Sequence, residues 1–294
     1  MDDNSFYAIG DPGRAALEVP AGPPPARVGA ADVEISCADL PGMLIRAASC
    51  RGILHRHRRT GRQDAFALGH RAQPGEEPVA VLVVCDGVGS FERSDEAAAL
   101  VSRRLAELGA AAVPWPDAYR QVNDELGKYA VSASPPGGPL AMATTAVAVS
   151  VGREVDDWVG EVAWVGDSPL WHLSSGGDWT MIAGPSAETA ADDYHAGSVR
   201  PLPSADGECS ISPFRLSGGA LFLMSDGVGN PLSYGPDVRA ALAQWWAHPP
   251  DPFTFAAQVG FAKRTHIDDR TTVGIWSVQD AGQREEPGKS QADF

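Results

Sequence analysis

The sequence predicts an α+β fold: a four-layer α-β-β-α sandwich in which two mainly antiparallel sheets are flanked by pairs of helices. Two observations support this prediction. Apolar runs of strand type recur along most of the chain, which indicates a mainly β core. Segments with helical periodicity occur in pairs between groups of strands, whereas a parallel sheet would require helices and strands to alternate one by one. The sequence therefore favours two packed sheets whose outer faces are covered by helices.

Seven apolar runs are predicted to be strands. They cover residues 44–54, 79–85, 141–151, 158–165, 169–173, 220–225 and 271–278.

Four segments show helical patterns. The first begins at Ser94, where SDEAAALVSRRLAELGAA opens with capping residues and then carries apolar groups three and four positions apart. The second follows Pro116, at DAYRQVNDELGKYA. The other two, PDVRAALAQWWAHP and PFTFAAQVGFAKRTH, open at or just after a proline, which suits the first helical turn.

The length of 294 residues suits one large domain. Residues 12–35 are rich in Pro, Ala and Gly without a helical or alternating period, and the last stretch, AGQREEPGKSQADF, is polar throughout. We therefore expect a loosely ordered N-terminal segment at 1–40, a folded domain at 41–280 and a polar tail at 281–294.

The composition excludes several classes of partner. The net charge of -15, from 23 basic and 38 acidic residues, would repel nucleic-acid backbones and anionic membranes. The N-terminus lacks the basic flank and apolar stretch of a signal peptide, and no run reaches the roughly 18 apolar residues of a membrane span, so we expect a cytoplasmic protein. The 4 cysteines are widely spaced and are expected to be free thiols.

Two distant segments resemble each other: VLVVCDGVGS, which contains Asp86, and LFLMSDGVGN, which contains Asp226. Each is an apolar strand that ends in Asp-Gly. A strand end holds its carboxylate rigidly, and the glycine that follows lets the backbone turn sharply and approach a ligand. The two ends could converge on one cation. The alternative for either copy alone is that Asp-Gly is simply a favourable turn dipeptide.

Further acidic residues adjoin predicted strands: Asp64, Asp167 and the pair Asp268 and Asp269. Taken singly, Asp167 could be hairpin chemistry and the pair a solvated loop before an edge strand. Together with the two Asp-Gly ends they would repel one another unless a cation neutralised them. Oxygen ligands favour magnesium or manganese over zinc. The histidines form no zinc motif, and a lone His172 is expected to be packed or exposed rather than a ligand.

Seven short motifs occur along the chain in this order: RQDAF, CDGVGS, SDEAA, ATTA, VGDSPLW, SDGVG and DDRTTV. In this order they resemble the metal-dependent protein phosphatases of the protein phosphatase 2C (PPM) type, and bacterial members in particular. The resemblance covers about residues 44–278. It implies a phosphatase that acts on phosphoserine and phosphothreonine in proteins, the products of Ser/Thr kinases, with two or possibly three Mn²⁺ or Mg²⁺ ions.

The resemblance also implies roles for individual residues. Asp86 would bridge two metals, and the carbonyl of Gly87 would bind one of them. Asp226 and Asp268 would complete the shell of the other metal, and Asp167 would help to hold a third, weaker one.

The same resemblance places further residues around the metals. Asp64 would orient metal-bound water. Asp269 stands where the family often has Asn, and Thr144 and Thr145 match a threonine pair that we take as structural. Arg59 has the spacing of a phosphate-binding arginine.

The arginine assignment has alternatives. Arg56, Arg58 and Arg62 crowd the same stretch, and any of them could make a bidentate contact with a phosphoryl group. The whole stretch could also be a solvated basic turn.

The sequence departs from the family at three places. Gln63 replaces the Glu that many members have before the first Asp, so one charge is missing beside a metal. Val88 and Gly89 stand where animal members have a His that acts as general acid, so the leaving group would take its proton from water. Residues 184–216, where the family has a variable flap, show no pattern that predicts a structure.

Two other functions remain open. Cys50 and Cys209 each precede an arginine by six residues, as in cysteine-based phosphatases, which need a phosphate-binding loop at a helix N-terminus to lower the thiol pKa. Cys50 instead lies in a strand-like run, and the segment CSISPFR after Cys209 has no glycine and contains a proline. A catalytically silent relative that binds phosphoproteins or serves as a regulatory domain is the other possibility. The neutral Gln63 is its main support.

The position of Gln63 can be tested directly. Replacement by Glu should tighten the binding of Mn²⁺ measured by calorimetry, because a carboxylate adds negative charge beside the cation. Unchanged or weaker affinity would refute the proposed position.

Overall fold

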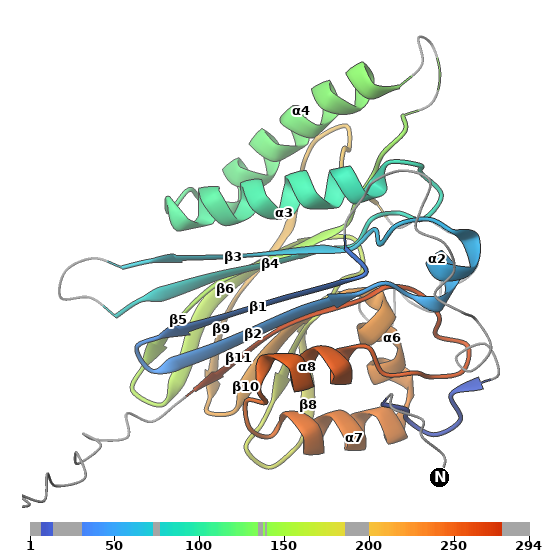
Figure 1. Cartoon of the computed structure of the whole chain (residues 1–294). Coiled ribbons are helices and arrows are strands. Elements are labelled where there is room, and N and C mark those ends of the chain that lie inside the picture. The colour runs from blue at the N-terminus through green and yellow to red at the C-terminus, as the bar shows by residue number, and fades with distance from the viewer. Residues whose placement is uncertain are drawn as a thin grey trace, which may run out of the picture.

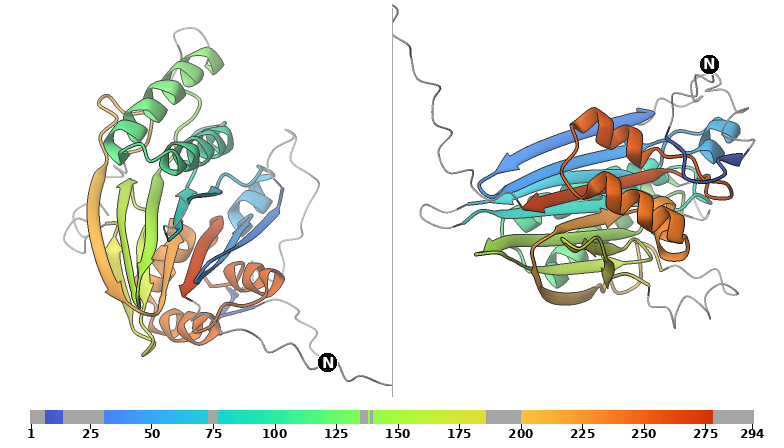
Figure 2. Two further views of the ribbon diagram at one scale, coloured as in Figure 1. Left: turned by 90° about the vertical axis from the view of Figure 1, so that its left-hand side faces the viewer. Right: turned by 90° about the horizontal axis from the view of Figure 1, so that it is seen from below.

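Two antiparallel sheets form the centre of the molecule (Figure 1). The computed structural model describes residues 7–13, 31–72, 77–134, 138, 140–185 and 200–277. Helices cover the outer face of each sheet, and the view along the strands in Figure 2 shows the resulting layers. The predicted four-layer α-β-β-α sandwich is confirmed.

The first sheet has six strands in the order β1-β2-β11-β10-β7-β8. Every neighbouring pair is antiparallel. The strands are β1 (Val33–Leu40), β2 (Met43–Cys50), β11 (Arg270–Ser277), β10 (Ala220–Met224), β7 (Leu170–Leu173) and β8 (Trp179–Ala183).

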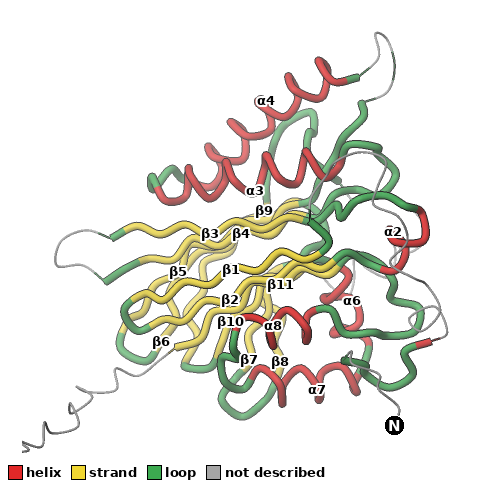
Figure 3. The backbone as a smooth tube through the Cα atoms, in the orientation of Figure 1, coloured by secondary structure: helices red, strands yellow, loops and turns green. Residues whose placement is uncertain are grey.

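The second sheet has five strands in the order β3-β4-β5-β6-β9, again antiparallel throughout. They are β3 (Ala65–Arg71), β4 (Val79–Cys85), β5 (Ala146–Glu154), β6 (Asp157–Val165) and β9 (Ser210–Ser217). Figure 3 shows the strands of both sheets ending together beside the short helices α2 and α6.

Helices cover both sheets in pairs. On the second sheet lie α3 (Ser94–Ala110) and α4 (Trp115–Ala133), and on the first lie α7 (Pro236–Trp246) and α8 (Pro252–Val259). Two short helices, α2 (Ile53–Arg58) and α6 (Asp226–Tyr234), lie at the end of the sandwich where the candidate site forms.

The alternation of side chains along β4 shows how the layers are held together. Val81 and Val83 pack in the cluster with α3 and α4, while Leu82 and Val84 pack in the cluster between the two sheets. All four side chains are fully buried. A strand buried on both faces is a nearly continuous apolar run, which is why it was predictable from sequence.

The predicted elements differ from the structure in several places. The strand expected at 44–54 ends at Cys50, because Gly52 begins the turn into α2. β1 lies within the segment 1–40 that was expected to be loosely ordered, so the expected start of the domain is corrected to include it: β1 pairs with β2 along its whole length. Residues 14–30 and the tail 281–294 lie outside the described residues.

Helix α6 was not predicted. Its sequence, DGVGNPLSY, contains two glycines and an internal proline, all of which disfavour a helix.

Among the helices of the described residues, none is long and apolar enough to cross a membrane.

Two phenylalanines of α8 provide a matched test of the helix layer. Phe255 is fully buried against Trp246 and Trp276, whereas Phe253 is 77% exposed. Phe255→Ala should lower the free energy of unfolding by about 3–5 kcal/mol. Phe253→Ala should change it by less than about 0.5 kcal/mol, as is usual for a surface position. Chemical denaturation of both variants checks the difference, and equal effects would contradict this packing.

Candidate metal centre

The acidic residues singled out from the sequence come together at one end of the sandwich. Asp64 precedes β3, Asp86 follows β4 and Asp167 follows β6, all in the second sheet. In the first sheet, Asp226 follows β10 and Asp268 lies shortly before β11. Because neighbouring strands are antiparallel, the start of one strand and the end of the next lie at the same end of the sheet. The site is therefore built from both sheets.

Asp86 lies at the centre of this group. Burial raises the pKa of its carboxyl well above the ordinary value, and the charges of Asp64, Asp226 and Asp167 raise it further. The side chains of Asp86 and Asp226 are within hydrogen-bonding distance of each other. Two carboxyl groups this close can share a proton, or a cation can take the place of that proton. The arrangement fits a bound cation.

The backbone around Asp86 is fixed by the ATTA strand. The carbonyl of Asp86 accepts hydrogen bonds from the Thr145 amide and the Thr144 hydroxyl, each at 2.8 Å. A side chain at Gly87 would come within 2.6 Å of the Gln63 carbonyl oxygen. The threonine pair thus supports the loop that carries Asp86, and position 87 requires glycine.

Asp226 begins α6, immediately after Ser225 at the N-cap. Burial and the charge of Asp167 raise the pKa of Asp226 to about 7. Gly227 is again required, because a Cβ there would lie 1.8 Å from the Asp269 carbonyl oxygen. Asp167 itself is partly buried, and burial raises its pKa.

Arg270 ties the two acidic segments of the first sheet together. This buried guanidinium donates to the Gly227 carbonyl at 2.7 Å and to the His266 carbonyl at 2.5 Å. It also lies over the Phe261 ring, 4.2 Å from its centroid. Burial lowers the pKa of Arg270 to about 10, so it remains charged at neutral pH. It thereby fixes the segment after Asp226 to the loop that leads to Asp268.

Asp64 is buried, with 3% of its surface exposed. Its Oδ2 accepts a hydrogen bond from the Thr271 hydroxyl at 2.8 Å, and Thr271 is 2.6 Å from the Ser49 hydroxyl. Burial, followed by the charge of Asp269, raises the pKa of Asp64 to about 8. Asp64 is therefore held in place by Thr271 of β11, and the negative charge of Asp269 lies near it.

The Asp268 and Asp269 pair divides into two roles. Asp269 is buried, and its carboxylate accepts the Gly52 and Gln63 amides, both at 2.6 Å. The Asp268 side chain is 51% exposed. The structural role therefore belongs to Asp269. Asp269 thus fastens the loop before Asp64 to the start of β11.

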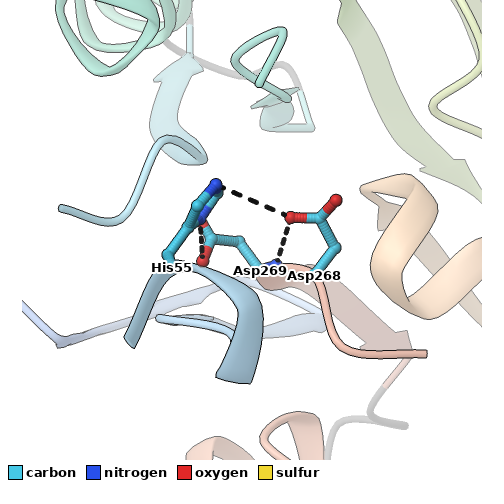
Figure 4. A group of neighbouring side chains, drawn as sticks. All are labelled: His55, Asp268 and Asp269. Atoms are coloured by element: carbon cyan, nitrogen blue, oxygen red, sulfur yellow. Dashed lines mark hydrogen bonds and ion pairs between the residues drawn. The ribbon is translucent and has the colours of Figure 1, made fainter. Parts of the chain in front are cut away.

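A histidine that the sequence analysis did not select joins this pair (Figure 4). His55 on α2 has Nδ1 2.8 Å from Asp269 Oδ1 and Nε2 4.0 Å from Asp268 Oδ1. Burial acts to lower the pKa of His55, but contact with Asp269 and the charge of Asp268 raise it overall. Its place was hidden because residues 51–58 were read as strand and basic turn, with no helix.

Gln63, one of the positions that depart from the family pattern, is only partly hydrogen-bonded in the structure. Gln63 is buried, and its Oε1 has no hydrogen-bond partner among the described residues. Its Nε2 donates to the Phe91 carbonyl at 3.4 Å. An unpartnered buried oxygen is costly, so water or a cation that it could contact would stabilise this loop.

The candidate arginines differ in their surroundings. Arg59, with a left-handed backbone (φ 59°), ends α2 and is exposed, as is Arg58. Arg62 is buried and already bonds the Ala31 carbonyl and Glu34. Arg56 lines a cavity of about 140 Å³ beside Asp268. The exposed pair is therefore the more available to a phosphoryl group.

Neither cysteine considered as a nucleophile is activated. Burial raises the pKa of Cys50 to about 11, and burial also raises that of Cys209 to about 11. Both remain protonated thiols at neutral pH, whereas a cysteine nucleophile reacts as the thiolate. His172 packs in β7 with its Nε2 3.0 Å from the Gly218 carbonyl oxygen, as expected for a histidine that is not a ligand.

The donor set as a whole fits hard divalent cations. It consists of carboxylates and a backbone carbonyl, which Mg²⁺ and Mn²⁺ bind, and it lacks the thiolates of a structural zinc site. The raised pKa values of Asp64, Asp86 and Asp226 show that negative charge here lacks compensation by the protein alone.

Comparison with known proteins agrees with this architecture. The family model described as protein phosphatase 2C matches residues 51–258, more than half of the chain. None of the curated proteins is similar enough in sequence to match.

Solved structures share the fold at low sequence identity. The catalytic domain of the serine/threonine protein phosphatase PstP in complex with 2 manganese ions has a TM-score of 0.58 and 21% identity, over 81% of this chain and 99% of that one. PppA, described as a key regulatory component of T6SS in Pseudomonas aeruginosa, has a TM-score of 0.56 and 19% identity, over 81% and 99%. RsbX in complex with magnesium has a TM-score of 0.55 and 13% identity, over 83% and 100%.

The raised pKa of Asp64 gives a pH-dependent prediction for the metal-free protein. Its folded pKa of about 8 lies above the unfolded value of about 3.9, so wild type loses stability relative to Asp64→Asn as the pH rises from about 4 through 8. Asn mimics the protonated carboxyl and should flatten the profile. Thermal unfolding in chelator across this range checks it. Parallel pH profiles for the two proteins would contradict the raised pKa.

Proposed function

Because the chain belongs to the protein phosphatase 2C family, we propose that it is a metal-dependent phosphatase of phosphoserine and phosphothreonine in proteins. The observation that carries the proposal is the convergence of carboxylates from both sheets, whose pKa values are raised by burial and by one another. A structural role alone would not require so much buried negative charge. Binding of divalent cations explains it.

The resemblance to the family suggests the proposed ligand set. Asp86 would bridge two cations, and the Gly87 carbonyl would contribute to one of them. Asp226 and Asp268 would hold the other. Asp167 would contribute to a third and weaker site.

Bound Mn²⁺ or Mg²⁺ would supply an acidified water and neutralise charge on the phosphoryl oxygens. The protein's own groups would position this chemistry. Asp64, whose carboxylate accepts a hydrogen bond from Thr271, would accept a hydrogen bond from the attacking water and orient it. Val88 and Gly89 carry no group that can give a proton, so solvent would protonate the leaving group. No covalent intermediate is needed.

Arg59 is the proposed contact to the phosphoryl group. It is exposed at the end of α2, and its planar guanidinium can bind two phosphoryl oxygens at once. Arg58 beside it can serve the same purpose. These cations also offset the net charge of -15, which would otherwise repel a phosphorylated protein.

One observation favours a second candidate, a catalytically weak or silent relative that binds phosphoproteins. Gln63 is neutral where many members of the family carry Glu, so the cation beside it would be held with one charge fewer. The remaining carboxylates are all in place, which favours the phosphatase.

The proposal predicts metal-dependent hydrolysis of p-nitrophenyl phosphate and of phosphoserine and phosphothreonine peptides. Activity should require Mn²⁺ or Mg²⁺ and be lost in chelator. Asp86→Asn and Asp226→Asn should each lower kcat/KM at least about a hundredfold, because each removes a charged ligand. Steady-state assays of the purified protein measure both effects.

Asp156→Asn is the matched control, since it makes the same change at an 80% exposed hairpin residue and should leave activity unchanged. Full activity of either Asp86→Asn or Asp226→Asn, or activity of the wild-type protein in chelator, would contradict the two-metal proposal. Activity that survives chelator but is lost in Cys50→Ser would revive the thiol mechanism. Tight Mn²⁺ binding without turnover of any phosphoester would favour the silent relative.

A further inference from the structure

We infer that His55 is a nitrogen ligand of the divalent cation held by Asp268. The inference rests on the proposed function, because that function places a cation at Asp268. It adds a donor of a different kind to a site made otherwise of oxygen ligands. Nothing in the order of the sequence motifs points to His55.

The orientation of the imidazole is the first step. Nδ1 of His55 lies 2.8 Å from Asp269 Oδ1 in an ion-pair contact, but the two atoms do not have the alignment of a hydrogen bond. Asp269 cannot turn away, since its two oxygens also accept the Gly52 and Gln63 amides. A carboxylate that holds one ring nitrogen of a histidine whose other nitrogen binds a metal is a recurrent arrangement.

The second step is the position of Nε2. It lies 4.0 Å from Asp268 Oδ1, a contact that Figure 4 marks with a dashed line. A cation with bonds of about 2.1 Å to each would hold them about 3.0 Å apart at a right angle and about 4.2 Å apart in line. The observed separation falls within these limits.

The third step is the setting of the two donors. The His55 side chain is 5% exposed, while the Asp268 side chain is 51% exposed. Asp268 Oδ1 accepts a hydrogen bond from the Asp269 amide at 2.9 Å, which orients this oxygen. A carboxylate oxygen has a second lone pair, and this lone pair would be available to the cation.

The fourth step is charge. A protonated imidazole at 4.0 Å from Asp268 would repel a divalent cation on that carboxylate. The form of His55 that would bind the cation is therefore the neutral imidazole, whose Nε2 carries a lone pair. A nitrogen ligand also favours Mn²⁺ over Mg²⁺, because Mg²⁺ strongly prefers oxygen.

Nuclear magnetic resonance tests the bond itself. In protein labelled with ¹⁵N-histidine and saturated with ¹¹³Cd²⁺ as a diamagnetic stand-in for Mn²⁺, one Nε2 resonance should be split by coupling to the metal. That resonance should be missing in His55→Gln. Binding of Cd²⁺ without a split histidine resonance, or a split resonance that persists in His55→Gln, would overturn the inference. The wild-type spectrum decides the matter even if the variant does not fold.

Calorimetry supplies the energetic counterpart. His55→Gln should weaken Mn²⁺ binding about tenfold or more and Mg²⁺ binding less, so the preference for Mn²⁺ falls. His57→Gln, an exposed histidine two positions along the same helix, should leave both affinities unchanged. Equal loss for both ions would indicate that His55 acts only through the fold, against the inference.

These results separate the inference from the proposed function. If no histidine binds the metal while Asp86→Asn still abolishes turnover, only the assignment of His55 is wrong. If the wild-type protein binds no divalent cation at all, both fall together.

Discussion

Mutual repulsion among buried carboxylates is the constraint around which this molecule is organised. Two sheets direct acidic strand ends to the same place, and burial raises the pKa of Asp64 and Asp226 to about 8 and 7. A stable fold has to hold these groups together against that repulsion. The buried Arg270, the threonines around Asp86 and the amides that bind Asp269 all serve this purpose. Glycine at 87 and 227 is required because no side chain fits between the loops.

The fold was predictable where strands are buried on both faces. The seven strands predicted from sequence are the inner strands of the two sheets, and the four that were missed, β1, β3, β8 and β9, are the edge strands. An edge strand is bordered on one side only and can be more polar. β9 shows this, because its side chains alternate in exposure and it contains Pro213, which an inner strand would not tolerate. Apolar runs identify the centre of a sheet but not its margins.

The candidate site was predictable for residues attached to those inner strands. Asp86 follows β4 directly and Asp226 follows β10 after one residue, and the structure brings them together as expected. His55 was missed because it lies on a six-residue helix without an apolar period. The separate roles of Asp268 and Asp269 were equally hidden, since they depend on which side chain turns inward to the Gly52 and Gln63 amides. Pairing across distant segments is not visible in either segment alone.

The origin of the donors in two different layers has a mechanical consequence. Asp64, Asp86 and Asp167 belong to one sheet, and Asp226 and Asp268 to the other, so the distances between donors depend on how the sheets slide against each other. The apolar contacts of Leu82 and Val84 between the sheets set that alignment. Core residues between the sheets therefore help to determine the distances between the carboxylates of the candidate site.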